Sequence, residues 1–161
     1  MKTTTAALAA LLALTGGAFA AGTHAGGHGE DGMMAIGTAG DTKKVKRTIN
    51  VTMRETSDGK MLFEPRVIKV RKGETIRLKF LNKGEGDHEF VMDTQEAVME
   101  HKELMARFPE MEHDDPNSVR LAPGARGEIV WTFANDGDFA FACLIPGHYE
   151  AGMHGALTVS K

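Results

Sequence analysis

Short runs in which apolar and polar residues alternate recur along most of the chain. A two-residue period is typical of β-strands that bury one face. Turn signals separate the runs, as at Arg71-Lys-Gly73-Glu and Ala122-Pro123-Gly124. Strands are expected over residues 45–53, 61–63, 67–70, 75–81, 88–92, 129–133, 139–143 and 156–159. About eight short strands with turns between them predict an all-β Greek-key sandwich or barrel.

One segment departs from this alternation and shows helical spacing. Thr94 suits a helix N-cap, and Pro109 is expected to end the helix early. The residues that recur at helical spacing are Ala97, His101, Leu104, Phe108 and Met111. We therefore expect one helical insert, over about residues 94–117, directly after the strand at 88–92.

The first 20 residues have the order of a secretory signal peptide. Lys2 precedes an apolar run at 6–14, and the small-residue pattern Ala18-Phe19-Ala20 follows. The apolar run is too short for a permanent membrane-spanning helix. We expect cleavage before Ala21, export to the periplasm, and no integral membrane segment in the mature chain.

Residues 21–44 are rich in Gly and contain almost no branched apolar side chains. Such a segment buries too little surface to offset its ordering entropy, so a flexible arm is expected there. The folded domain is expected at 45–161.

Charge narrows the range of partners. The whole chain has a formal charge of −3, and without Lys2 it has 18 basic and 22 acidic side chains. This balance argues against a nucleic-acid partner and is compatible with a basic redox partner.

The chain has a single cysteine, Cys143, which is unusual for an exported protein because such proteins use cysteines in pairs. Cys143 is therefore a metal ligand, a reactive thiol or an intermolecular bridge. It opens the pattern Cys143-x4-His148-x4-Met153. One thiolate, one imidazole and one thioether on a short loop are three of the four ligands of a mononuclear type 1 copper site.

Two other chemistries fit this pattern less well. A zinc site with one Cys and two His ligands would not need Met153. A Cys–His nucleophile would need a third group to orient it, and none is evident.

A second imidazole is needed, and His88 in Gly-Asp-His88-Glu-Phe is the best placed because it begins a strand. The other candidates lie in the arm, in the insert or directly after Met153. They are His24, His28, His101, His113 and His154. The fixed geometry that a metal ligand needs is harder to hold on an arm or an insert than on a strand.

The segment Cys143-x2-Pro146-Gly147-His148-x4-Met153-x-Gly155 resembles the cupredoxins, and the resemblance extends over residues 45–161. The ligand-loop spacing is similar to that of rusticyanin and the phytocyanins. The resemblance implies a cupredoxin-like sandwich with copper as its cofactor, held by His88, Cys143, His148 and Met153. Two features depart from the azurin and plastocyanin pattern: Glu89 stands where those proteins have Asn, and the insert at 94–117 is long.

The resemblance implies a one-electron carrier rather than an enzyme. Its partner would be a cytochrome or an oxidase that contacts the edge of His148. We expect a monomer. Multicopper oxidases and nitrite reductases use several such domains, and this chain is long enough for only one.

Enrichment in His and Met outside the main motif suggests an alternative function. The residues concerned are His24, His28, Met33 and Met34 in the arm, and Met99, His101, Met105, Met111 and His113 in the insert. Thioethers and imidazoles suit Cu(I), which favours copper tolerance, buffering or delivery to copper-handling proteins. Helical methionines that fill gaps in the core are the other interpretation.

Overall fold

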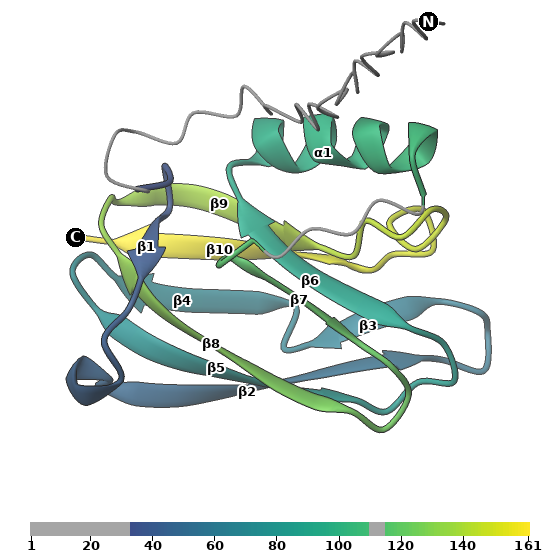
Figure 1. Cartoon of the computed structure of the whole chain (residues 1–161), viewed down its shortest axis with the longest axis horizontal. Helices are drawn as coiled ribbons and strands as arrows, with labels where there is room; N and C mark the ends of the chain where they lie inside the picture. Colours follow the sequence, from purple (N-terminus) through teal and green to yellow (C-terminus); the bar gives the residue numbers. More distant parts are fainter. Residues whose placement is uncertain (1–32, 110–114) are drawn as a thin grey trace, which may run out of the picture.

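A computed structural model describes residues 33–109 and 115–161 of the chain. Ten strands of these ranges form two five-stranded sheets that face each other (Figure 1). The first sheet has the order β1 (Gly37–Ala39), β8 (Arg126–Phe133), β5 (Thr75–Asn82), β2 (Arg47–Glu55) and β3 (Met61–Glu64). The second has the order β4 (Val67–Arg71), β10 (His154–Ser160), β9 (Gly137–Ala142), β6 (His88–Asp93) and β7 (Ser118–Leu121). The expected all-β sandwich with one helical insert is confirmed.

Most neighbouring strands are antiparallel, but β2 pairs with β5 and β4 pairs with β10 in parallel. The chain therefore crosses from one sheet to the other several times, as between β3 and β4, β4 and β5, and β5 and β6. The end of β2, the start of β6 and the end of β9 thereby meet at one end of the sandwich.

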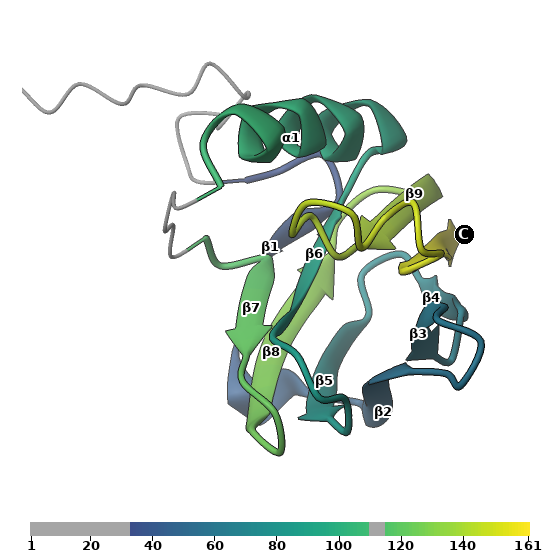
Figure 2. The same cartoon turned by 90° about the vertical axis from the view of Figure 1, so that its right-hand side faces the viewer.

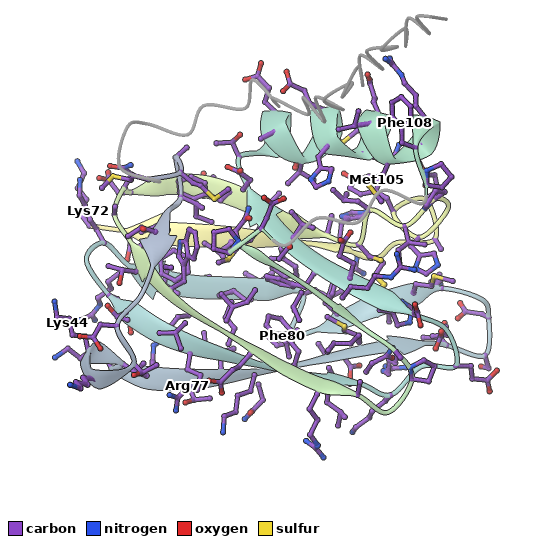
Figure 3. All side chains as sticks on the ribbon, in the orientation of Figure 1. Lys44, Lys72, Arg77, Phe80, Met105 and Phe108 are labelled. Atoms are coloured by element: carbon purple, nitrogen blue, oxygen red, sulfur yellow. The ribbon has the colours of Figure 1, made fainter. Side chains whose placement is uncertain are left out.

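Alternation places one row of side chains from each strand in the core. In β5, for example, Ile76, Leu78 and Phe80 are buried, whereas Lys79 between them is exposed. Figure 3 shows Phe80 between the sheets, with Lys44, Lys72 and Arg77 at the outside. The eight strands expected from alternation are all present, and no end is shifted by more than three residues.

A cluster of aromatic rings fills the centre of the core. Phe63 contacts Phe90 and Phe141 edge to face, with centroids 5.6 and 5.4 Å apart. Phe90 stacks on Phe141 at 5.1 Å. Because these rings come from β3, β6 and β9, they join the two sheets near the ends that lead to the predicted ligands.

The insert forms helix α1 (Gln95–Arg107), which lies over the outer face of β6 and β9 (Figures 1 and 2). Thr94 accepts a hydrogen bond from the Ala97 backbone N–H, and the helix ends before Pro109, both as expected. Strand β6 is thus covered on both faces, which explains why five of its six residues are buried.

The expected apolar face of the helix was wrong. Val98 and Met105 are buried against β6 and β9, whereas Phe108 is 53% exposed. Figure 3 shows Met105 below the helix and Phe108 at its end. The buried pair is offset by one residue, or about 100° of rotation, from the spacing read in the sequence. The face that is buried is the one that packs the β-branched Val98 and the flexible thioether of Met105 against the small residues Ala140 and Ala142.

The folded domain begins before Val45, so the expected boundary of the arm at Lys44 was wrong. Strand β1 pairs with β8, and Ile36 is fully buried. The indole N–H of Trp131 also donates to the Ile36 carbonyl, at 3.5 Å. Strand pairing, the buried Ile36 side chain and the Trp131 hydrogen bond together tie this Gly-rich segment to the sandwich. The expected signal peptide and residues 21–32 of the arm lie outside the described residues.

Strand β7 was also missed, because the insert was expected to run on to residue 117 and no strand was expected before the turn at Ala122. It pairs with β6 from His88 to Val91.

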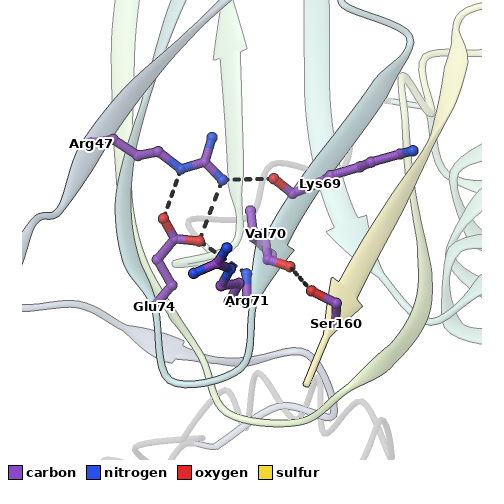
Figure 4. A pocket seen from close by; sticks show the side chains of 6 residues that line it. All are labelled: Arg47, Lys69, Val70, Arg71, Glu74 and Ser160. Atoms are coloured by element: carbon purple, nitrogen blue, oxygen red, sulfur yellow. Dashed lines mark hydrogen bonds and ion pairs between the residues drawn. The ribbon is translucent and has the colours of Figure 1, made fainter.

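Polar side chains join the two sheets at the end away from His88. Arg47, at the start of β2, donates to Glu74 at 2.7 Å and to the Lys69 carbonyl at 2.6 Å (Figure 4). Within the second sheet, the Ser160 hydroxyl of β10 donates to the Val70 carbonyl of β4 at 3.3 Å. The Arg47 guanidinium therefore reaches from the first sheet to β4 of the second.

Among the described residues, no helix has both the length and the apolar character needed to cross a membrane.

The role of β1 can be tested by truncating Ile36. We expect Ile36→Ala to lower the free energy of unfolding of the metal-free protein by about 2–5 kcal/mol, because it removes a fully buried side chain. Thr42→Ala, at an exposed position of the following turn, is the matched control and should cost less than about 0.5 kcal/mol. Chemical denaturation measures both. Equal stability of the two variants would show that β1 is not part of the cooperative unit.

Candidate metal centre

Three side chains with metal-binding atoms converge at one end of the sandwich. His88 is the first residue of β6, Cys143 follows β9, and His148 lies on the loop between β9 and β10. Their ligand atoms all lie within 4.8 Å of one another. The Nδ1 atom of His148 is 3.3 Å from both the Nδ1 of His88 and the Sγ of Cys143. Of the described residues, this is the only group of His, Cys and acidic side chains that meets the distance requirement for a metal ion.

The loop that carries His148 is folded back by its own backbone hydrogen bonds. The Cys143 N–H donates to the Met153 carbonyl, and the Met153 N–H donates to the His148 carbonyl, both at 3.0 Å. Gly147 and Gly152 have φ values of 89° and 101°, which allow the turns on either side of this pairing. Met153 is fully buried in the same core cluster as Cys143. The backbone of Met153 is thus tied directly to two of the three converging residues.

The sulfur of Cys143 is fully buried. Burial raises the pKa of this thiol to about 12, since the low-dielectric interior disfavours the charged thiolate. The Glu89 backbone N–H donates to the sulfur at 3.3 Å and opposes this effect only in part. Without a cation beside it, Cys143 is therefore a neutral thiol at physiological pH.

His148 is half-buried, and its pKa lies below the ordinary value, first because of burial and second because of the neighbouring His88. Its imidazole is therefore neutral at pH 7 and has a lone pair available for a metal. On the same loop, Pro146 and Gly147 are exposed. The loop histidine therefore lies close to the protein surface.

Glu55, at the end of β2, is a further residue of the centre that sequence reasoning missed. Its Oε1 atom lies 3.0 Å from Nε2 of His88, whose side chain is fully buried. Burial alone would raise the pKa of Glu55, but the backbone donors of Gly86 and Glu85 and the nearby His88 bring it below the ordinary value. The sequence did contain a signal for Glu55: side chains alternate along β2, which puts Glu55 in the same inward-facing row as Val51 and Met53.

The helical insert contacts the ligand loop through two charged or aromatic pairs. Lys102 of α1 forms an ion pair with Glu150 at 2.7 Å, and its ammonium group lies 5.4 Å from the centre of the Tyr149 ring. Tyr149 stacks in turn on His154, with centroids 4.6 Å apart. The insert therefore braces the segment between His148 and Met153 from outside.

The other histidines do not join the cluster where the structure describes them. His154 stacks on Tyr149, and His101 is a half-buried residue of the helix. His24, His28 and His113 lie outside the described residues. Met105 of the insert is a core residue, 2% exposed, so the gap-filling interpretation holds for it.

Comparison with known proteins now adds to this geometry. Residues 49–160 match the family of copper binding proteins described as plastocyanin/azurin. The chain belongs to this family. The family and the donor set agree: a soft thiolate and two imidazoles suit copper in both of its common oxidation states. Copper is the cofactor of this cupredoxin, and the His88, Cys143 and His148 cluster offers a place for one ion.

Two relatives are named copper-resistant cuproprotein CopI. The protein from Rubrivivax gelatinosus is 48% identical over 136 residues, which cover 84% of this cupredoxin and 80% of the relative. The protein from Pseudomonas aeruginosa is 34% identical, covering 78% of this chain and 82% of its own length.

Solved structures show the same fold. A reduced auracyanin from Roseiflexus castenholzii has a TM-score of 0.60 and 23% identity, covering 73% of this cupredoxin and 99% of the auracyanin. A multicopper oxidase has a TM-score of 0.53 at 14% identity, and only 38% of that longer chain is covered.

The raised pKa of Cys143 predicts the protons released on copper binding. The thiol is protonated between pH 7 and 9 and must ionise to bind copper, whereas the neutral His148 has no proton to lose. We expect release of about one proton per copper, and an apparent affinity that rises about tenfold per pH unit over this range. Calorimetry in buffers of different ionisation enthalpy measures the proton count. Binding without proton release would mean that the thiolate already exists in the metal-free protein.

Proposed function

We propose that this protein is an exported cupredoxin that binds one copper ion through His88, Cys143, His148 and Met153 and protects the cell against excess copper. The observation that carries the proposal is the convergence of a thiol and two imidazoles in a chain that is 48% identical to a protein named for copper resistance. Export rests on the signal-peptide pattern of the first 20 residues.

The ligand set is supported by which atoms face one another. The two Nδ1 atoms and the sulfur point to a common position, while Nε2 of His88 is engaged by Glu55. Met153 is the candidate for the fourth, weaker ligand because its backbone is bonded to both Cys143 and His148 and its side chain is buried. A thioether at that position would complete the type 1 donor set.

The buried thiol also suits a protein that takes up and holds copper. A neutral Cys143 exchanges its proton for the metal. The fraction of sites that hold copper therefore depends on the concentration of free copper. The binding free energy adds to the stability of the folded chain as copper rises. These are properties of a copper-responsive binder, and they require no redox partner.

Electron transfer is the second candidate, and the position of His148 favours it. The imidazole is half-buried on a loop with exposed neighbours, so an electron has a short path between the metal and a docked protein. A cytochrome or oxidase would be the partner in that case. Copper tolerance and electron transfer would use the same site. They differ in the defect that a cell without the protein would show.

The ligand set is tested by a copper titration followed by visible absorbance. We expect the wild type to develop an intense thiolate-to-copper band that saturates at one equivalent, and Cys143→Ser to lack this band. His88→Ala and His148→Ala should weaken binding by more than the 10–100-fold typical of changes outside the first shell. Met153→Leu should keep the band but shift it and raise the reduction potential. His154→Ala is the matched control, because His154 adjoins Met153 and stacks on Tyr149; a loss there equal to that of His88→Ala would contradict the assignment.

The cellular role is tested by deleting the gene and growing the host over a range of copper concentrations. We expect copper sensitivity that wild-type protein rescues and Cys143→Ser does not. Unchanged copper tolerance, together with a respiratory defect at low copper, would contradict the tolerance role and favour the electron carrier.

A further inference from the structure

The carboxylate of Glu55 lies on the side of His88 that faces away from the other ligands. Its Oε1 is 3.0 Å from Nε2, while Nδ1 of the same ring is 3.3 Å from Nδ1 of His148. We propose that Glu55 is a positioning residue that fixes the tautomer and orientation of His88 so that Nδ1 is directed to copper. This inference rests on the proposed ligand set.

The tautomer follows from the chemistry of the pair. An ionised carboxylate only accepts hydrogen bonds, and a neutral imidazole has a single N–H. The His88 side chain is fully buried, so solvent water does not compete for its nitrogens. The proton therefore lies on Nε2, and Nδ1 keeps the lone pair that a metal needs. A carboxylate behind a ligating histidine also increases the basicity of the ring.

The loop before β6 holds this carboxylate in place. Glu55 accepts from the Glu85 N–H at 3.0 Å and from the Gly86 N–H at 3.1 Å. The loop itself is fixed by the buried Asn82, which donates to the Gly86 carbonyl and accepts from the Gly84 N–H, both at 2.8 Å. Because this loop leads directly into His88, one short segment presents both the ligand and the donors that fix its partner.

Gly84 is required for this arrangement, whereas Gly86 is not. A Cβ atom built on Gly84 would lie 2.2 Å from Oε2 of Glu55, far inside van der Waals contact. A Cβ on Gly86 would lie 3.6 Å from Oε1, an ordinary contact. An alanine at residue 84 would therefore push the carboxylate aside without changing any charge. The same change at residue 86 would leave it in place.

Glu55 also places negative charge next to the metal position. A carboxylate beside a ligand stabilises Cu(II) more than Cu(I), because the ion with the higher charge gains more. Loss of the carboxylate should therefore weaken Cu(II) binding preferentially. Each tenfold preferential loss raises the reduction potential by about 59 mV.

The experiment compares two variants with two matched controls. Glu55→Gln removes the charge, and Gly84→Ala displaces it. Glu64→Gln removes an exposed carboxylate that pairs with Arg54 on the neighbouring strand, and Gly86→Ala makes the same substitution in the same loop without a clash. We expect Glu55→Gln and Gly84→Ala to lose 10–100-fold in Cu(II) affinity and to raise the potential, while both controls stay within about twofold of the wild type.

Nitrogen NMR of the metal-free protein gives a readout that needs no copper. We expect His88 to carry its proton on Nε2 in the wild type and in both controls, and to populate both tautomers in Glu55→Gln and Gly84→Ala. A wild-type His88 protonated on Nδ1 would overturn the proposal, as would variants that match their controls in tautomer and potential.

The proposal and the ligand set fail in different ways. If His88→Ala binds copper as tightly as the wild type, the ligand set is wrong, whatever the tautomer of His88. If His88→Ala abolishes tight binding but Glu55→Gln has no effect on tautomer or potential, only the positioning role is wrong. Thermal unfolding of the metal-free variants shows whether each one folds, and the wild-type tautomer remains decisive if a variant does not.

Discussion

Burial of the Cys143 sulfur is the constraint on which the rest of the centre depends. A fully buried thiol with a pKa near 12 is stable as a neutral group and becomes a thiolate only when a cation compensates the charge. The protein therefore needs no preformed charge in its core, and the domain can fold before metal arrives. The backbone N–H groups of Glu89 and Ile145 already favour the future thiolate, since each lowers the pKa of Cys143 and so opposes part of the effect of burial.

Two apolar clusters enclose the strand that supplies His88. Phe90 and Met92 of β6 belong to the main core, and Val91 between them belongs to the cluster under α1. The insert thus covers the outer face of β6 and contacts the ligand loop through Lys102. A histidine held at the start of a strand with both faces covered has little freedom to move, which suits a site that must keep its geometry.

Sequence patterns were sufficient for the features that repeat or that lie close together in the chain. Alternation found eight strands, and the Cys143-x4-His148 spacing with His88 found the three side chains that meet. The ligand role of Met153 stays a prediction. Sequence reasoning failed where the deciding contact is distant. Ile36 is buried by strand β8, almost 100 residues away in the chain, and Glu55 meets His88 through the crossing of the sheets. The helix face was misread because the small residues of β9, rather than the helix itself, select Val98 and Met105.

Strand β2 connects the two ends of the sandwich, with Arg47 at its first residue and Glu55 at its last. Its parallel pairing with β5 runs from Arg47 to Met53, and the Arg47 contacts with Glu74 and the Lys69 carbonyl hold the far end. Side chains on a strand alternate between faces, so a register slip of one residue would turn Glu55 outward and bring Arg54 toward His88. A guanidinium would then stand where the carboxylate is, and would repel the metal ion. The sign of the charge beside the copper position is therefore decided by strand register, which is secured along the whole of β2, from the Arg47 contacts at one end to the pairing of Glu55 with Met61 at the other.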